Sequence, residues 1–219
     1  MELTVFWTMC SANGIVMEEE QLNQILRYQK ELLYWNKQLN LISRQDEENI
    51  ALHHIFHSLI VCKYIDFPQK AKCLDVGTGG GLPGIPIKIA NPEISMLLVD
   101  SIKKKLKIAE MMSQHTGLKK IEALCIRAED LQNTKKYIGY FDFIFARAVA
   151  QIEKLLEWTN PLLKYSGKFV FLKGGDLDYE IKVAENKYPK YKFDVKQIVA
   201  VGDNWFEKEE KKIVIISER

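Results

Sequence analysis

The chain has 219 residues, of which 47% are hydrophobic and 27% are charged, and its formal net charge is +2. These values are typical of a folded protein and exclude disorder as the main state. The small net charge excludes a uniformly basic nucleic-acid binder but permits local basic clusters. The four cysteines lack C-x-x-C spacing, and no apolar run could span a bilayer. We therefore expect a cytoplasmic protein with reduced thiols, without a membrane span or a bound metal.

The N-terminal third of the chain is expected to be helical. Residues 1–17 lack the basic start of a signal peptide, and we expect them to form a loose leader. Apolar residues at helical spacing predict one helix from Leu22 to Leu39 and a second, largely buried helix from Glu47 to Tyr64. The expected organisation is a leader (1–17), an N-terminal helical segment (18–70) that packs on the core, and the core itself (71–219).

From Lys72 onward, strand and helix patterns alternate, which predicts a mostly parallel sheet with helices on both faces. The predicted strands are Cys73–Val76, Ser95–Asp100, Ile121–Arg127, Phe141–Ala146 and Lys168–Lys173. The predicted helices between them are Pro83–Ala90, Ile102–Thr116 and Ile152–Leu163. After a helix near Leu177–Lys187, the strands Phe193–Val201 and Lys212–Ser217 are joined by a polar loop too short for a crossover, so the last strand should enter the sheet reversed. This α/β order resembles the Rossmann-like fold of class I methyltransferases.

A glycine-rich loop, Asp75-Val-Gly-Thr-Gly-Gly-Gly-Leu-Pro-Gly84, joins the first of these strands to the next helix. Because glycine has no Cβ atom, a ligand can lie against the backbone there and meet free N–H groups at the start of the helix. Gly77 and Gly79 are therefore candidate cofactor residues. The glycines alone also fit a dinucleotide fingerprint, and a ligand-free turn is a further alternative.

Two acids bear on the choice of cofactor. Asp75 would repel the pyrophosphate of a dinucleotide but favours the ammonium and sulfonium of S-adenosylmethionine. Asp100, at the end of the second strand, is placed to accept hydrogen bonds from ribose hydroxyls, a role that dinucleotide sites share. Ala128 and Glu129 follow the third strand and could hold the adenine, although a solvated acidic turn explains them equally well. We predict S-adenosylmethionine, with a dinucleotide oxidoreductase as the alternative.

Together these motifs give the chain a family resemblance. From about Leu33 to Gly174 it resembles the bacterial small-subunit rRNA guanine-N7 methyltransferases, also called the glucose-inhibited division protein B family. The motifs that carry the resemblance are Trp35-Asn36-x-x-x-Asn40-Leu41, Asp75-Val-Gly-Thr-Gly-x-Gly-Leu-Pro-Gly-Ile-Pro86, Asp100-Ser101, Ala128-Glu129, Ala146-Arg147-Ala148 and Leu172-Lys173-Gly174. One position departs from the family: His57 stands where the family usually has an acid in His-x-x-Asp-Ser.

The resemblance implies methyl transfer from S-adenosylmethionine to N7 of a guanine in 16S rRNA, either free or within the 30S particle, and we expect a monomer. The cofactor contacts that it implies are Gly77, Leu82, Ala128, Glu129 and Arg147. A methyltransferase for small molecules or proteins, and a non-catalytic RNA-binding protein with the same fold, are the alternatives.

The expected chemistry needs no general base, because guanine N7 has a free lone pair and no proton. Arg147 is our candidate for orienting the cofactor or the O6/N7 edge of guanine, with a structural ion pair as the alternative. Lys173 is expected to contact phosphate or base, unless it is merely exposed. His53 and His57 lie four residues apart, but without a third ligand we expect core or groove histidines rather than a metal site.

Lysines gather in the nucleotide-binding half of the chain. They could follow RNA phosphates if they cluster around the cleft, although each one alone is more often a solvated side chain. Trp35 could stack on a splayed base or belong to the core. The lysine groups are Lys103-Lys104-Lys105 with Lys107, Lys119-Lys120 and Lys135-Lys136.

Overall fold

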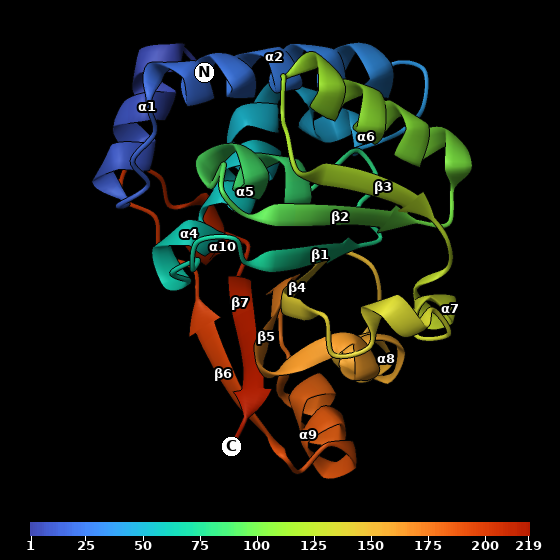
Figure 1. Ribbon diagram of the computed structural model, residues 1–219. Helices are drawn as coiled ribbons and strands as arrows, with labels where there is room; N and C mark the ends of the chain where they lie inside the picture. Colours follow the sequence, from blue (N-terminus) through green and yellow to red (C-terminus); the bar gives the residue numbers. More distant parts are fainter.

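A seven-stranded sheet forms the centre of the molecule, with the strand order β3-β2-β1-β4-β5-β7-β6 (Figure 1). The computed structural model describes residues 1–219. The strands are β1 (Lys72–Val76), β2 (Ser95–Asp100), β3 (Ile121–Cys125), β4 (Phe141–Arg147), β5 (Leu163–Gly174), β6 (Tyr191–Gln197) and β7 (Lys211–Glu218). Strands β1 to β5 pair in parallel, and β7 runs antiparallel between β5 and β6. The predicted sheet, mostly parallel with a reversed last strand, is confirmed.

Helices cover both faces of this sheet (Figure 1). The α-helices are α1 (Leu3–Ala12), α2 (Glu19–Asn36), α3 (His57–Leu59), α4 (Val61–Tyr64), α5 (Gly84–Ala90), α6 (Lys103–His115), α7 (Ala128–Leu131), α8 (Ile152–Thr159), α9 (Asp178–Lys187) and α10 (Trp205–Lys208). Helices α1 to α6 pack on one face, and α7 to α9 pack on the other. Successive residues of β1 alternate between these two cores, with Cys73 in one and Leu74 in the other, as the pleat of a strand requires.

Residues 1–17 are not the loose leader that we expected. They contain α1, whose side chains Phe6, Met9 and Cys10 are buried in the same core as α2 and α5. Asn13, which follows α1, donates to the carbonyl of Val201 and accepts from its backbone N–H at 2.9–3.0 Å. The expectation was wrong because the mildly apolar residues of this segment find a partner surface that is distant in sequence.

The segment from residue 44 to residue 64 also differs from the single helix that we predicted. It consists of a 3₁₀-helix η1 (Arg44–Asn49), a π-helix η2 (Ile50–Phe56), and the short helices α3 and α4. The apolar pattern correctly indicated burial but could not distinguish α from π winding, because the two differ by one residue per hydrogen-bonded ring. π-Turns are frequent at functional sites. Here the π-helix carries His53 and His54.

Two element boundaries in the second half of the chain differ from the predicted ones for local reasons. The predicted helix 152–163 ends at Thr159 and continues as the 3₁₀-helix η4 (Asn160–Leu162), because Pro161 has no N–H to extend an α-helix. Strand β5 begins earlier than predicted, at Leu163, and a register irregularity between Phe141 and Phe143 accommodates the extra residues. None of the helices is both long enough and apolar enough to cross a membrane.

Candidate functional site

Asp75 lies beneath the glycine loop and holds its two ends through hydrogen bonds. This residue is the last but one of β1, lies between β2 and β4 in the sheet, and is fully buried. Its Oδ2 accepts a hydrogen bond from the Thr78 hydroxyl at 2.6 Å and one from the Gly84 N–H at 2.8 Å. A Cβ atom on Gly84 would lie 2.7 Å from the same oxygen. Only glycine therefore lets the first turn of α5 approach the acid this closely.

The other oxygen of Asp75, Oδ1, is buried and has no hydrogen-bond partner. Burial raises the pKa of this carboxyl to about 7, although the hydrogen bonds from Thr78 and Gly84 oppose the shift. An unpartnered carboxylate oxygen in an apolar environment is costly unless a positive charge lies near it. Asp75 is thus suited to a cationic ligand, through its field rather than through exposed contact.

Asp100, the last residue of β2, accepts hydrogen bonds from the glycine loop and from the start of the segment that leads to α6. Its Oδ2 accepts from the Gly79 N–H at 2.9 Å and its Oδ1 accepts from the Ile102 N–H at 2.7 Å. These bonds fix the glycine loop relative to the start of α6. The carboxylate still has free lone pairs, because each oxygen can accept two hydrogen bonds.

A first cavity, here called the glycine-loop cavity, opens at the carboxyl ends of β1, β2 and β3. Ligands of open α/β sheets bind at this edge, where the strand order reverses between β1 and β4. Of the predicted cofactor residues, Gly77, Asp100, Ala128 and Glu129 line it, whereas Asp75, Gly79, Leu82 and Arg147 do not. The remaining lining residues are Val76, Val99, Ser101, Ile126, Arg127, Val149 and Trp158.

Two predicted residues, Gly79 and Leu82, lie behind this cavity and do not line it. Gly79 lies in its loop with φ +54° and donates to Asp100. Leu82 is buried in the core beneath the loop. The apolar lining by Ile126, Val149 and Trp158 escaped the sequence analysis, because single apolar residues after strands look like ordinary core.

The turn after β4 separates the glycine-loop cavity from a second one. Arg147 lines the second cavity, and Val149, two residues later, lines the first. Ala148 between them has φ +55°, a left-handed conformation that is uncommon outside glycine and that recurs at functional sites. Val149 lies over Gly77 so closely that a Cβ atom there would be 2.6 Å from the valine methyl. The turn therefore aims one side chain at each cavity.

The second cavity, here called the arginine cavity, is lined by side chains from four separate parts of the chain. Both predicted catalytic residues, Arg147 and Lys173, line it. The other lining residues are Asp46, His53, His54, His57, Ala148, Leu172, Gly174, Leu177, Glu180, Trp205 and Lys211. Cations and imidazoles outnumber the two acids, so this cavity favours an electron-rich or anionic ligand.

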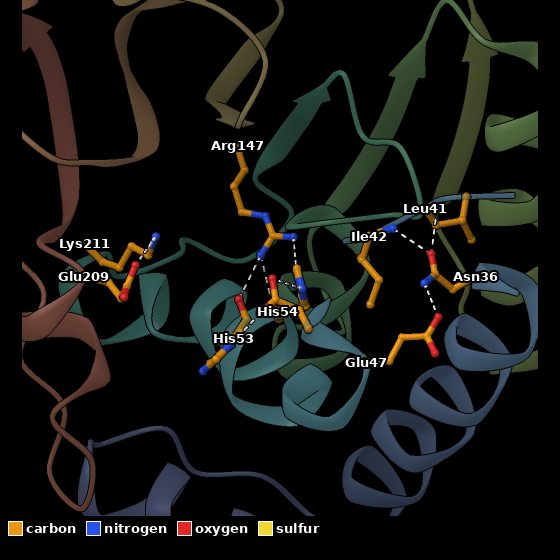
Figure 2. A network of polar contacts seen from close by, with 10 residues as sticks. Asn36, Leu41, Ile42, Glu47, His53, His54, Arg147, Glu209 and Lys211 are labelled. Atoms are coloured by element: carbon orange, nitrogen blue, oxygen red, sulfur yellow. Dashed lines mark hydrogen bonds and ion pairs between the residues drawn. The ribbon is translucent and has the colours of Figure 1, made fainter. Parts of the chain in front are cut away.

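Arg147 points from the end of β4 toward the π-helix (Figure 2). Its guanidinium lies 2.9 Å from Nδ1 of His54 and 3.4 Å from the carbonyl oxygens of His53 and His54. Arginine can only donate, so Nδ1 of His54 must accept, and this imidazole is neutral with its proton on Nε2. Burial and the charge of Arg147 lower the pKa of His54 to about 4, in agreement with that tautomer. Burial also lowers the pKa of Arg147.

Asp46 lies behind the two histidines. One carboxylate oxygen is 3.0 Å from Nδ1 of His53, and the other is 3.5 Å from Nε2 of His54. The His53 ring stacks on Trp205, with ring centroids 4.0 Å apart and planes inclined by 11°. Arg147 is thus linked to the loop between β6 and β7 through side chains alone. The sequence analysis missed Asp46 and Trp205, since nothing in their spacing connects them to residue 147.

Lys173 is neither free nor fully exposed. Its Nζ lies 2.6 Å from Glu180 and donates to the carbonyl of Ala150 at 2.9 Å, which leaves one N–H for a ligand. His57 is buried, its Nε2 has no partner, and it packs edge-on against Trp205 and Phe206. No group of three metal-binding side chains occurs in the structure, and the histidines are occupied by aromatic and acidic neighbours.

Asn36, from the Trp35-Asn36 motif, holds the loop that follows α2 (Figure 2). The buried Asn36 accepts from the backbone N–H groups of Leu41 and Ile42 and donates to Glu47 at 2.7 Å. Leu41 is thereby held against Gly80, where a Cβ atom would lie 3.2 Å from it. The hydroxyl of Tyr28 donates to the Gly80 carbonyl from the same side. Helix α2 and the loop after it therefore pack directly against the glycine loop.

A family model described as rRNA small subunit methyltransferase G matches residues 21–213 of this chain. The chain belongs to this family. Its relatives include the ribosomal RNA small subunit methyltransferase G of Chlorobium phaeobacteroides, 40% identical over 177 residues, which are 81% of this chain and 78% of the relative. The protein of the same name from Chlorobium limicola is 40% identical over 183 residues, 84% of this chain and 81% of that one.

The fold of the backbone is also consistent with this family. The ribosomal protein L11 methylase of Lactobacillus delbrueckii subsp. bulgaricus has a similar fold, with a TM-score of 0.58 at 17% identity over 79% of each chain. At that identity the likeness concerns the fold alone. The seven-stranded sheet with its reversed β7 is the fold of class I methyltransferases.

Proposed function

We propose that this protein transfers the methyl group of S-adenosylmethionine to N7 of a guanine in 16S rRNA. The observation that carries the proposal is the pair of cavities on either side of residues 147–149. One is lined by Asp100, Ala128 and Glu129, and the other by Arg147 and Lys173. We further propose that the protein acts as a monomer, on free 16S rRNA or on the 30S particle.

The residues of the glycine-loop cavity fit S-adenosylmethionine. Asp75 lies behind this cavity, and its Oδ1 is buried without a hydrogen-bond partner. Burial raises the pKa of this carboxyl because it disfavours the negative charge, and a ligand that carries positive charge without phosphate would offset that cost. Asp100 would hold the ribose hydroxyls, and the Ala128–Glu129 backbone with Ile126 and Trp158 would enclose the adenine. When bound, the cofactor supplies an electrophilic methyl group on a sulfonium.

The arginine cavity would receive the target base. In the proposed transfer the lone pair of guanine N7 would form the new bond to the methyl carbon, and the electron pair of the carbon–sulfur bond would stay on sulfur. No proton moves, so the chain needs to orient the base and to exclude water. Arg147 and Lys173 can donate to O6, and the reaction leaves the base with a positive charge. Asp46 and Glu180, which line the same cavity, would offset that charge.

The test uses tritiated S-adenosylmethionine with deproteinised 16S rRNA and, separately, with 30S particles from a bacterium that lacks this modification. The RNA is then digested to nucleosides and separated. We expect label in 7-methylguanosine at a single site, and none when the S-adenosylmethionine is replaced by tritiated methionine. Label in another nucleoside, or incorporation into small molecules or proteins only, would contradict the proposal.

A further inference from the structure

A groove lies between the end of α2 and helix α6, and it shares no lining residue with either cavity. Four of its lining residues are apolar, and the polar ones are two lysines, one glutamate and one glutamine. The lining residues are Trp35, Leu39, Lys104, Lys107, Ile108, Glu110, Met111 and Gln114. The proposed reaction does not use any of these residues.

The lysines along α6 lack acidic partners. Lys103, Lys104, Lys105 and Lys107 form no ion pair, whereas lysines elsewhere, such as those at 120, 173 and 187, lie 2.6–3.0 Å from carboxylates. Lys103, Lys104 and Lys105 form the first turn of α6, which contains no acid. Their positive charges lie at the positive end of the helix dipole, which is also unfavourable. Their mutual repulsion is unfavourable in the free protein, and an anionic partner would relieve it.

The same groove offers aromatic surface. Trp35 is half-buried in its wall, and Tyr34 beside it is 59% exposed, with ring centroids 5.1 Å apart in an edge-to-face arrangement. Unpaired bases stack on such side chains whatever their sequence, while lysines hold the adjoining phosphates. The combination of unpaired lysines and an accessible indole suits a single-stranded nucleic acid better than an acidic protein segment.

The elements that form the groove connect to the sheet edge that holds the glycine-loop cavity. Helix α6 starts three residues after the end of β2, where Asp100 lines the glycine-loop cavity. The loop that follows Trp35 reaches the glycine loop through Leu41. Figure 1 shows α6 beside α2, next to the strands β2 and β3. A strand whose target base entered the arginine cavity would therefore have this basic surface within reach.

We propose that this groove binds a single-stranded segment of the substrate rRNA, with phosphates on Lys104 and Lys107 and a base stacked on Trp35. The inference rests on the proposed function for its choice of RNA. It adds a docking site that is separate from the reacting groups.

The test compares two charge-matched double variants of the full chain. Lys104→Gln/Lys107→Gln changes the groove, and Lys182→Gln/Lys192→Gln changes two exposed, unpaired lysines on α9 and β6. Binding of deproteinised 16S rRNA is measured as a function of salt. We expect the groove variant to lose about tenfold in affinity and its salt slope to fall by about 1.4, since each single-strand phosphate contact contributes about 0.7. The control should change neither, and S-adenosylmethionine affinity should be equal in all three proteins.

Trp35→Leu tests the stacking separately. It should weaken rRNA binding at least about fivefold without changing the salt slope, because stacking involves no counterion release. Thermal unfolding of this variant shows whether the fold is intact. A stable Trp35→Leu protein with unchanged rRNA affinity would overturn the proposal.

Three further outcomes decide the inference. Equal losses in the two lysine variants would mean a general charge effect and would overturn it. A loss seen with 30S particles but not with bare rRNA would mean that a ribosomal protein occupies the groove, which also overturns it. A selective loss for bare rRNA supports it, even if the methylated atom is not guanine N7, so its failure is distinguishable from failure of the proposed function.

Discussion

The two cavities lie on either side of one short turn, yet they are opposite in charge and in construction. The glycine-loop cavity is made by strand ends and backbone, with Asp100 and Glu129 in its wall and Asp75 behind it. The arginine cavity is made by long side chains, most of them cationic or aromatic. The difference matches a division of work, in which an acidic site holds a cationic donor and a basic site holds an electron-rich acceptor on RNA.

The largest expected effect comes from removing the charge of Asp75 on the acidic side, meaning the glycine-loop cavity with Asp75 behind it. Asp75→Asn keeps an oxygen for the bonds from Thr78 and Gly84 but abolishes the negative charge. At roughly 5–8 Å and an effective dielectric constant of about 20, a unit charge contributes about 2–3 kcal/mol. We therefore expect S-adenosylmethionine affinity to fall by roughly 30- to 100-fold, measured by calorimetry, while rRNA affinity stays unchanged.

Lys173→Ala is the comparison for Asp75→Asn on the basic side, meaning the arginine cavity. It removes a partly buried charge that lines the arginine cavity, and it should leave S-adenosylmethionine affinity within about twofold and lower the rate of transfer to rRNA instead. Because Asp75→Asn relieves a buried charge, its unfolding temperature should be equal to or above that of the parent protein. Similar losses of cofactor affinity in both variants would remove the distinction between the two cavities.

The acidic side could be predicted from the sequence because its parts are local. Asp75 and the glycines up to Gly84 fall within ten residues. Asp100 ends β2 as predicted, and Ala128 comes shortly after β3, which ends two residues before its predicted end. Parallel strands bring their carboxyl ends to one edge, so order along the chain implied proximity. What the sequence could not indicate is that Asp75 faces inward, beneath the loop, and lines neither cavity.

The basic side could be predicted only in part. Arg147 and Lys173 lie at the carboxyl ends of β4 and β5 and were found, but much of their surroundings comes from the π-helix and from the hairpin at the end of the chain. Asp46 and Trp205 are 159 positions apart in the sequence and meet through His53. Such contacts depend on how the N-terminal helices pack on the sheet, which periodicity does not encode. For the same reason the packing of α1 was not foreseen.

An intermediate effect is expected from loosening Arg147. His54→Leu removes the acceptor at Nδ1 and leaves only the two carbonyl contacts at 3.4 Å. Losing a hydrogen bond to a buried charged group costs about 1.5–3 kcal/mol. We expect kcat for rRNA methylation to fall about tenfold or more, with S-adenosylmethionine affinity unchanged.

His54→Gln provides the control, because its amide oxygen can accept from Arg147. It should recover most of the activity if His54 acts by positioning the guanidinium. If Gln and Leu variants lose activity equally while both remain folded, the imidazole has another role. A fall in cofactor affinity with either variant would place Arg147 on the acidic side instead.

The smallest expected effect is a pH dependence confined to the acidic side. The pKa of Asp75 is raised to about 7, and a cationic ligand favours the ionised form. Affinity for S-adenosylmethionine should therefore fall as pH falls, by about threefold from pH 7.5 to pH 6.5 for a group with that pKa. The difference between the parent protein and Asp75→Asn, measured at each pH, isolates this group from ionisations of the ligand and of the histidines.

Stability should respond to the same group with the opposite sign. In the unfolded chain this carboxyl ionises near its ordinary pKa of 3.8, whereas in the folded protein it retains its proton up to about 7. Between these values the folded state binds more protons, so this group's contribution to stability declines as pH rises. Cofactor affinity rises over the upper part of the same range. Asp75→Asn should flatten both curves, and flattening of the stability curve alone would show that the charge behind the glycine loop does not act on the cofactor.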